Sequence, residues 1–161
     1  MIGQELKVGI GDMKLTRGGG TIITYALGSC IGISIYDPML RLGALIHIML
    51  PEYGNTHDPN IFKYADTGIR ETVRKLTAFG LVKSRAEVKI AGGAKMFEIS
   101  GNANFGNIGQ RNAMSVKRTL LQEGFRLKAE DVGGSSARTM SIDVATGAVK
   151  IKVFGRPDLY L

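Results

Sequence analysis

The sequence contains few residues capable of thiol or imidazole chemistry. Among 161 residues there are one cysteine, Cys30, two histidines, His47 and His57, and no tryptophan. A single cysteine cannot form an internal disulfide, which is consistent with a reducing compartment. A zinc site would have to combine Cys30, His47 and His57 with carboxylates. We expect no metal and no cofactor, with zinc on these three residues as the alternative.

Long apolar runs are also absent. The longest, around "GALIHIMLP", is far shorter than the roughly 20 residues that span a bilayer. Near the N-terminus, Glu5, Lys7, Asp12 and Lys14 interrupt the apolar stretch that a secretory signal would need. These absences predict a cytoplasmic protein with no membrane insertion.

Basic residues are numerous but form no dense cluster. Lysine and arginine number 21 against 14 acidic residues, which gives a formal net charge of +7. Zinc-finger spacing and aromatic RNA-binding strand motifs are absent, so we expect no nucleic-acid partner. The positive charge either draws the protein to acidic partner surfaces or only maintains solubility.

Two glycine motifs fail as nucleotide sites. "GIGDMK" has Lys14 where a dinucleotide-binding fingerprint needs its third glycine, so we interpret it as a turn. "AGGAKMF" lacks the spacing of a phosphate-binding loop and the Ser or Thr that follows its lysine.

Hydrophobic periodicity predicts one domain, residues 1–161, of the α+β class. Apolar and β-branched runs indicate strands at 6–10, 21–27, 31–36 and 42–50, and later in "AEVKIAGG", "RLKAEDVGG", "RTMSIDVATG" and "AVKIKVFG". Helical periodicity covers 62–79 and 108–124, and Asn107 is the expected N-cap of the second helix. The residues expected to face the core are Ala65, Ile69, Val73 and Leu76 in the first helix and Ala113, Val116, Leu120 and Leu121 in the second.

The cysteine follows Gly-Ser in "YALGSC", where a strand is about to turn. A turn in "YDPMLR" would join the strand after Cys30 to the strand that contains His47. If Asp37 lies opposite Leu40, the constant sum of opposed residue numbers places Cys30 opposite His47. Opposed residues share a face of the sheet with Cβ atoms about 5 Å apart. This register predicts a thiol and an imidazole within reach of each other.

A thiol beside an imidazole can attack a carbonyl, because the imidazole takes its proton. Thr24, in the adjacent predicted strand, is the candidate hydroxyl that orients the imidazole. The simpler interpretations are a buried packing cysteine, a core histidine with a backbone partner and an ordinary strand threonine. His57 is the rival base, but it lies in a polar loop and has no register argument in its favour.

With these residues assembled, the sequence resembles the CheD family of chemoreceptor glutamine deamidases over nearly its whole length. The blocks that carry the resemblance are "LGSC" at 27–30, "HIMLP" at 47–51, "KYAD" at 63–66, "IAGGAKMF" at 90–97, "NIGQRN" at 107–112 and "EDVGGSSAR" at 130–138. The family's nucleophile, base and assisting hydroxyl correspond to Cys30, His47 and Thr24.

The resemblance implies a three-layer fold of mixed and antiparallel sheets with two main helices, similar to cysteine-dependent deamidase toxins. It implies hydrolysis of glutamine side chains to glutamate on methyl-accepting chemotaxis receptors, and possible cleavage of receptor methyl esters. It also implies binding to a CheC-type phosphatase. The alternative function is therefore an adaptor that activates such a phosphatase without catalysis. The glycines of "IAGGAKMF" and "EDVGGSSAR" are either substrate loops or tight turns with positive φ.

Overall fold

The order of strands and helices follows the predicted α+β pattern. The computed structural model describes residues 4–96 and 107–161, which form ten strands, two α-helices and two short 3-10 helices. Phe97, at the end of "IAGGAKMF", lies outside these residues. The elements are β1 (Glu5–Val8), β2 (Asp12–Arg17), β3 (Thr21–Leu27), β4 (Ile31–Asp37), β5 (Leu42–Ile48), η1 (Ile61–Lys63), α1 (Ala65–Ala78), η2 (Lys83–Arg85), β6 (Glu87–Gly92), α3 (Ile108–Gln122), β7 (Leu127–Val132), β8 (Arg138–Asp143), β9 (Val149–Lys152) and β10 (Leu159–Tyr160).

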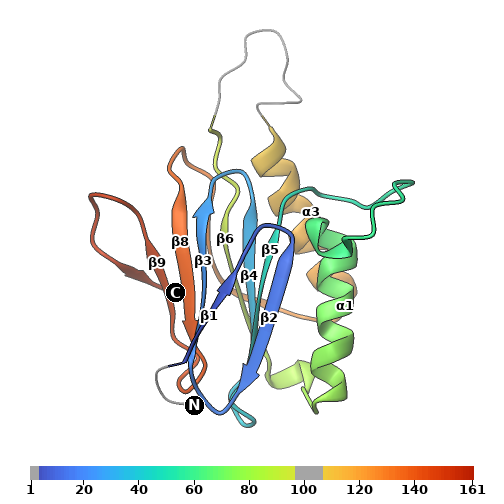
Figure 1. Ribbon diagram of the computed structural model, residues 1–161, viewed down its shortest axis with the longest axis vertical. Coiled ribbons are helices and arrows are strands. Elements are labelled where there is room, and N and C mark those ends of the chain that lie inside the picture. The colour runs from blue at the N-terminus through green and yellow to red at the C-terminus, as the bar shows by residue number, and fades with distance from the viewer. Residues whose placement is uncertain (1–3, 97–106) are drawn as a thin grey trace, which may run out of the picture.

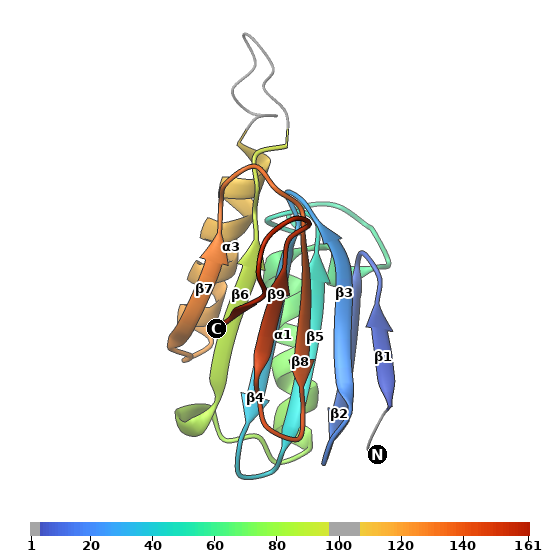
Figure 2. The ribbon, with the colours of Figure 1, turned by 90° about the vertical axis from the view of Figure 1, so that its left-hand side faces the viewer.

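The elements form three layers. The middle sheet has the strand order β2-β5-β4-β6-β7, and the outer sheet has the order β1-β3-β8-β9-β10. Helices α1 and α3 cover one face of the middle sheet, and the outer sheet covers the other (Figures 1 and 2). Each sheet is mixed, because β1 pairs with β3 and β6 pairs with β7 in parallel, whereas the other pairs are antiparallel. The α+β class and the layered arrangement of mixed sheets with two helices are confirmed.

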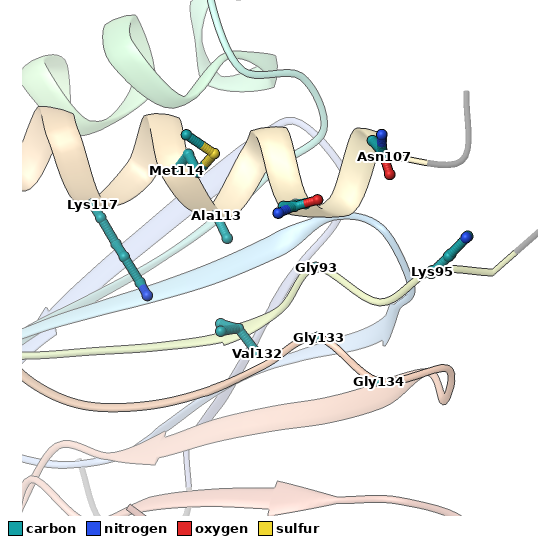
Figure 3. Close-up of a pocket in the computed structure, with 10 residues that line it drawn as sticks. Gly93, Lys95, Asn107, Ala113, Met114, Lys117, Val132, Gly133 and Gly134 are labelled. Atoms are coloured by element: carbon teal, nitrogen blue, oxygen red, sulfur yellow. The ribbon is translucent and has the colours of Figure 1, made fainter. Parts of the chain in front are cut away.

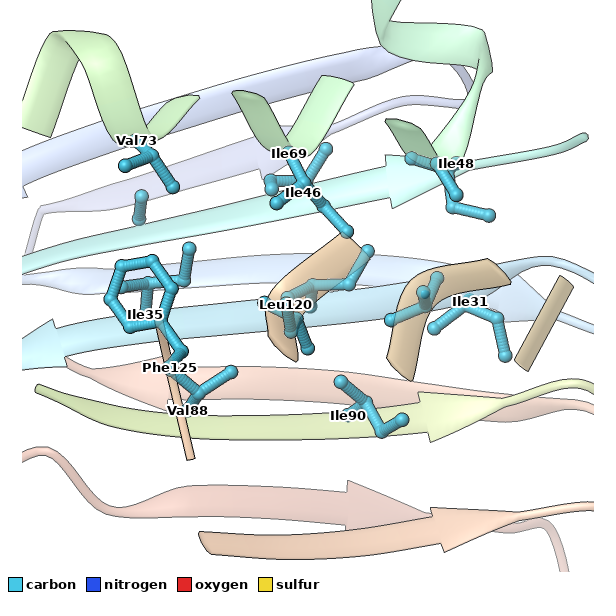
Figure 4. Packing of buried hydrophobic residues seen from close by; sticks show 14 of the residues in the cluster. Ile31, Ile35, Ile46, Ile48, Ile69, Val73, Val88, Ile90, Leu120 and Phe125 are labelled. Atoms are coloured by element: carbon cyan, nitrogen blue, oxygen red, sulfur yellow. The ribbon is translucent and has the colours of Figure 1, made fainter. Parts of the chain in front are cut away.

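Strands β4 and β5 lie at the centre of the middle sheet and are buried along their whole length. Because both faces are covered, their sequences are almost continuously apolar and lack the polar alternation of a half-exposed strand. Their isoleucines pack against α1 and α3 (Figure 4). Tyr36 and Leu45 belong to the second core, between the two sheets.

The apolar helix faces agree with the predicted periodicity at all positions but one. Ala65, Ile69, Val73 and Leu76 of α1 are buried, as are Ala113, Val116 and Leu120 of α3. Leu121 was expected to face the core and is 75% exposed. It follows Leu120 by one residue, a rotation of about 100° that carries its side chain off the buried face. Asn107 takes the N-cap position of α3, but its side chain makes no capping hydrogen bond.

Strand β2 has no counterpart among the predicted elements. "GIGDMK" does contain the expected turn, in which Gly11 has φ +71°, but the chain continues from Asp12 as an edge strand paired with β5. The side chains of β2 are half-buried or exposed, so its sequence lacks the apolar pattern of a core strand. No helix in the described parts of the chain is long and apolar enough to cross a membrane.

Glycines at the end of β6 allow two chain segments to approach closely. Gly92 and Gly93 have φ values of +116° and +66°. A Cβ atom at Gly92 would lie 2.1 Å from the Cys30 carbonyl oxygen, which accepts a hydrogen bond of 2.8 Å from the Gly93 N–H. Gly133 and Gly134 also have positive φ, so the expected positive φ is found at all four glycines, although Gly92 is the last residue of β6.

We predict that Gly92→Ala lowers the free energy of unfolding by at least about 3 kcal/mol, because it combines backbone strain with a clash against the Cys30 carbonyl. Gly133→Ala is the matched control, since Gly133 has φ +88° but no atom within 4 Å of the position that a Cβ would take. Its loss should be about 1–2 kcal/mol. Urea unfolding measures both values. Equal losses in the two variants would contradict the importance of the Cys30 contact.

Candidate functional site

The β4–β5 hairpin brings Cys30 and His47 to the same end of the middle sheet, but not in the predicted register. Asp37 pairs with Leu42, so Gly32 rather than Cys30 lies opposite His47. The error comes from the loop, which contains four residues, 38–41. The Asp37 carboxylate accepts the backbone N–H groups of Met39 and Leu40, and Arg41 adopts φ +48°. These features produce a wider turn than the expected one.

The observed register differs from the predicted one by two residues, so Cys30 and His47 still lie on the same face of the middle sheet. Side chains alternate along a strand, so Cys30, two residues before Gly32, projects to the same side as Gly32 and His47. Cys30 packs against the core between the two sheets, which agrees with this placement. Diagonal neighbours on one face of an antiparallel pair lie about 7–8 Å apart, within reach of a long side chain.

Thr24 reaches the imidazole from the outer sheet. Its Oγ1 lies 2.7 Å from His47 Nδ1 and donates to the Val8 carbonyl oxygen at 2.7 Å. Val8 is the direct partner of Thr24 in the parallel β1–β3 pairing. The structure therefore brings Thr24 and His47 into contact across the interface between the sheets, as the sequence predicts.

The two hydrogen bonds of Thr24 decide which imidazole nitrogen carries a proton. A hydroxyl has one proton to donate, and a backbone carbonyl can only accept. When Thr24 donates to Val8, its oxygen is left to accept a proton from His47 Nδ1. The Nε2 atom of the neutral ring then carries a free lone pair, as a general base requires.

Burial keeps His47 neutral. The side chain is 1% exposed, and desolvation lowers its pKa from 6.5 to about 4. Nε2 is buried and has no hydrogen-bond partner among the described residues. The ring is therefore an uncharged base with one nitrogen bound to Thr24 and the other available to a proton donor.

Cys30 is half-buried and forms no disulfide. Burial raises the pKa of its thiol, and the Cys30 backbone N–H beside the sulfur offsets part of that increase. The structure thus favours a neutral thiol and a neutral imidazole at rest. The physical reason is that both charged forms would be placed at a poorly solvated interface between sheets.

The segment before Cys30 has an irregular backbone. The β3–β8 register shifts between Thr24 and Leu27, and Ala26 adopts φ +59°. Bulges of this kind redirect a strand end and are frequent beside active sites. The Ala94 N–H then donates to the Gly28 carbonyl at 2.8 Å, which holds the segment against the chain that follows β6.

Arg138 fixes the ends of three strands near this segment, and sequence analysis did not select it. Its guanidinium donates to the carbonyls of Gly92 and Gly133 at 2.7 and 2.6 Å, and pairs with Asp131 at 3.1 Å. Arg138 is the last residue of the motif block "EDVGGSSAR", which was the one indication of its importance. The sequence cannot indicate that this arginine is buried and binds backbone carbonyls.

His57 does not join the site. It is exposed in the loop between β5 and η1, whereas His47 is buried at the sheet interface. Within the described residues, no three His, Cys, Asp or Glu side chains are grouped as metal ligands.

A cavity of about 460 Å³ lies between α3 and the ends of β6 and β7 (Figure 3). Three of the motif blocks meet there. "IAGGAKMF" contributes Gly93 and Lys95, "NIGQRN" contributes Asn107 and Gln110, and "EDVGGSSAR" contributes Gly133 and Gly134. Thr24, Cys30 and His47 do not line it. It borders the candidate site through Gly93, whose N–H binds the Cys30 carbonyl.

Comparison with known proteins shows which protein family the chain belongs to. The family model described as CheD chemotactic sensory transduction matches residues 49–153. The chain is 44% identical over 154 residues to a Clostridium botulinum protein and 44% identical over 156 residues to a Pyrococcus abyssi protein, with 94% of each chain covered. It is 46% identical over 157 residues to a Moorella thermoacetica protein, covering 96% of this chain and 93% of the relative. Each relative bears the name "Probable chemoreceptor glutamine deamidase CheD".

The chain belongs to the CheD family, and the resemblance found in the sequence is confirmed.

We predict that His47 makes stability depend on pH between 6.5 and 4. The unfolded chain binds a proton near pH 6.5, whereas the folded chain binds it only near pH 4, so the free energy of unfolding falls as the pH falls. The lost stability should approach about 3 kcal/mol. Urea unfolding of wild type and His47→Gln at several pH values measures this contribution.

The exposed residue His57 provides the control, because His57→Gln should retain the wild-type pH profile. A His47→Gln profile parallel to that of wild type would show that burial does not shift the pKa of His47.

Proposed function

We propose that this protein hydrolyses glutamine side chains on chemoreceptors to glutamate, using Cys30 as nucleophile, His47 as base and Thr24 as the residue that orients His47. The observation that carries the proposal is the 2.7 Å contact between Thr24 Oγ1 and His47 Nδ1, with His47 Nε2 unpartnered among the described residues. The names of the relatives support the substrate class.

The first half of the reaction forms a thioester. His47 Nε2 takes the Cys30 thiol proton as the sulfur attacks the carboxamide carbon, which becomes tetrahedral with a negatively charged oxygen. The protonated imidazole then gives that proton to the departing nitrogen, and ammonia leaves. Because the resting pair is neutral, charge develops only while substrate covers the site.

The second half releases the product. His47 Nε2, neutral again, takes a proton from water as the water oxygen attacks the thioester carbon. Collapse of this second tetrahedral intermediate breaks the carbon–sulfur bond, and the proton returns to sulfur. The products are a glutamate side chain and the free thiol. The same steps would hydrolyse a glutamyl methyl ester with methanol as the leaving group.

The charge of the protein is suited to an acidic substrate surface. The net charge of +7 raises the rate of encounter with acidic partners. Chemoreceptor segments in the cytoplasm are the substrates we propose, so the proposal includes a cytoplasmic location for this protein.

The adaptor function remains a second proposal, in which the protein binds a CheC-type phosphatase and activates it. This function needs a binding surface but neither a nucleophile nor a base. The unpartnered Nε2, at the same end of the sheet as a half-buried thiol, favours the enzyme, because an adaptor has no use for a buried acceptor held without a donor.

We predict that Cys30→Ala abolishes ammonia release from receptor cytoplasmic fragments, because no other thiol is available. Cys30→Ser should also be inactive, since the hydroxyl is a weaker nucleophile and the neutral imidazole provides less activation than it needs. Mass spectrometry of the fragments detects each glutamine-to-glutamate change.

Binding of receptor fragments or phosphatase to Cys30→Ala, measured by calorimetry, separates enzyme from adaptor. The variant should bind as wild type does, because the change removes only one sulfur atom. If wild type binds both partners and never releases ammonia, the adaptor proposal replaces the deamidase proposal.

We predict that Thr24→Val lowers kcat about 10- to 100-fold, because the isosteric side chain cannot accept from His47 Nδ1 and the tautomer with a free Nε2 is no longer favoured. Thr24→Ser keeps the hydroxyl and should stay within about threefold of wild type. Steady-state ammonia release measures both variants. Equal losses of kcat in Thr24→Val and Thr24→Ser would show that the effect comes from packing rather than from the hydroxyl.

A further inference from the structure

Asn112 lies beside the nucleophile segment on the opposite side from Thr24. It belongs to α3, is fully buried, and donates both Nδ2 protons to backbone carbonyls, those of Ser29 and Met49, each at 3.0 Å. Met49 follows β5 and lies two residues after His47. One amide group therefore connects the segment that carries the thiol to the strand that carries the base.

The bond to Ser29 has a consequence for Cys30. The Ser29 carbonyl and the Cys30 N–H belong to one peptide group, which is planar and trans, so they point in opposite directions. When Asn112 holds the carbonyl, the direction of the Cys30 N–H is determined as well. Donation to the carbonyl also polarises the peptide, which strengthens its N–H as a donor.

The Cys30 N–H is a backbone donor of the nucleophilic residue itself. Among the described residues it has no backbone acceptor in another residue, and it lies beside its own sulfur atom. The next peptide is held in turn by the Gly93 N–H, which binds the Cys30 carbonyl at 2.8 Å. Both peptide groups around Cys30 are therefore held through their carbonyls, and the Cys30 N–H, which faces its own sulfur, binds no other backbone acceptor in the described residues.

Asn112 is an unusual choice for a residue whose role is only structural. Its Oδ1 atom is buried and has no partner in the described parts of the chain. A buried acceptor without a donor is destabilising, and such groups are rare. The two carbonyl contacts explain the orientation of the amide, because only Nδ2 can donate to them.

We propose that Asn112 is a positioning residue that holds the Ser29–Cys30 peptide so that the Cys30 N–H binds the oxyanion formed during attack on a carbonyl. The inference rests on the proposed function for its natural substrate, but it concerns any reaction in which the Cys30 sulfur attacks a carbonyl. Preorganised backbone donors of this kind stabilise the charge that develops in the transition state.

Two reactions of the same sulfur atom test the proposal. Acylation by p-nitrophenyl acetate forms a sulfur–carbon bond through a tetrahedral oxyanion and expels p-nitrophenolate. Alkylation by iodoacetamide displaces iodide at a saturated carbon and forms no oxyanion. Cys30 is the only cysteine, so the Cys30→Ala blank gives the background of both reactions.

For Asn112→Ala we expect acylation to slow about 10-fold or more, while alkylation stays within about twofold of wild type. With a receptor fragment, kcat for ammonia release should fall by a similar factor and KM should remain unchanged. Asn112→Leu, which keeps the volume of the side chain without its donors, gives the same comparison if the alanine variant does not fold.

Ser115→Ala is the matched control. Ser115 lies on the same helix, is buried, and donates to the Pro51 carbonyl at 2.6 Å, but it does not bind the nucleophile segment. Both rates should remain within about twofold of wild type in this variant.

Equal slowing of acylation and alkylation in the Asn112 variants would overturn the proposal, because Asn112 would then act on the thiol or on the fold. Unchanged acylation would overturn it as well. Neither reagent requires a receptor, so this comparison can be made even if wild type releases no ammonia from receptor fragments. Absence of ammonia release would contradict the proposed function but not the proposed role of Asn112.

Discussion

The hydrogen bond between Thr24 and His47 joins the two sheets at the point where the proposed chemistry occurs. Thr24 comes from the outer sheet and His47 from the middle sheet, and their side-chain atoms meet at 2.7 Å. The bond requires β3 and β5 to face each other, which in turn requires the core that packs the sheets together. Because Thr24 also donates to Val8, strand β1 of the outer sheet determines the proton position on a ring of the middle sheet.

Burial at this interface sets the electrostatics of the site. Desolvation lowers the pKa of His47 and raises that of Cys30, so both groups are neutral before substrate arrives. A neutral pair avoids the destabilising effect of buried charges in the resting protein. The proposed reaction then generates charge only transiently, next to a backbone N–H whose direction is held by Asn112 and beside a ring held by Thr24.

The backbone around Cys30 is constrained from several directions. Gly93 and Ala94 donate to the carbonyls of Cys30 and Gly28, while Arg138 holds the carbonyl of Gly92. Gly92 permits this approach because a Cβ there would overlap the Cys30 carbonyl oxygen. The motif blocks that contain these residues are distant in sequence but meet at one end of the middle sheet, where β4 begins and β6 ends.

The sequence by itself determined the α+β class, most of the strands and the buried faces of both helices, because hydrophobic periodicity is a local property of the chain. It also indicated Cys30 and His47 as candidates, since the chain has one cysteine and two histidines, and Thr24 through its place in the neighbouring predicted strand. The tertiary structure decided the hairpin register, in which Gly32 lies opposite His47, because the carboxylate of Asp37 stabilises a wider turn than its sequence indicates. It alone decided the contacts of Val8, Gly92, Asn112 and Arg138, since each contact joins a backbone carbonyl to a residue distant in sequence, and backbone groups leave no signal in the order of side chains.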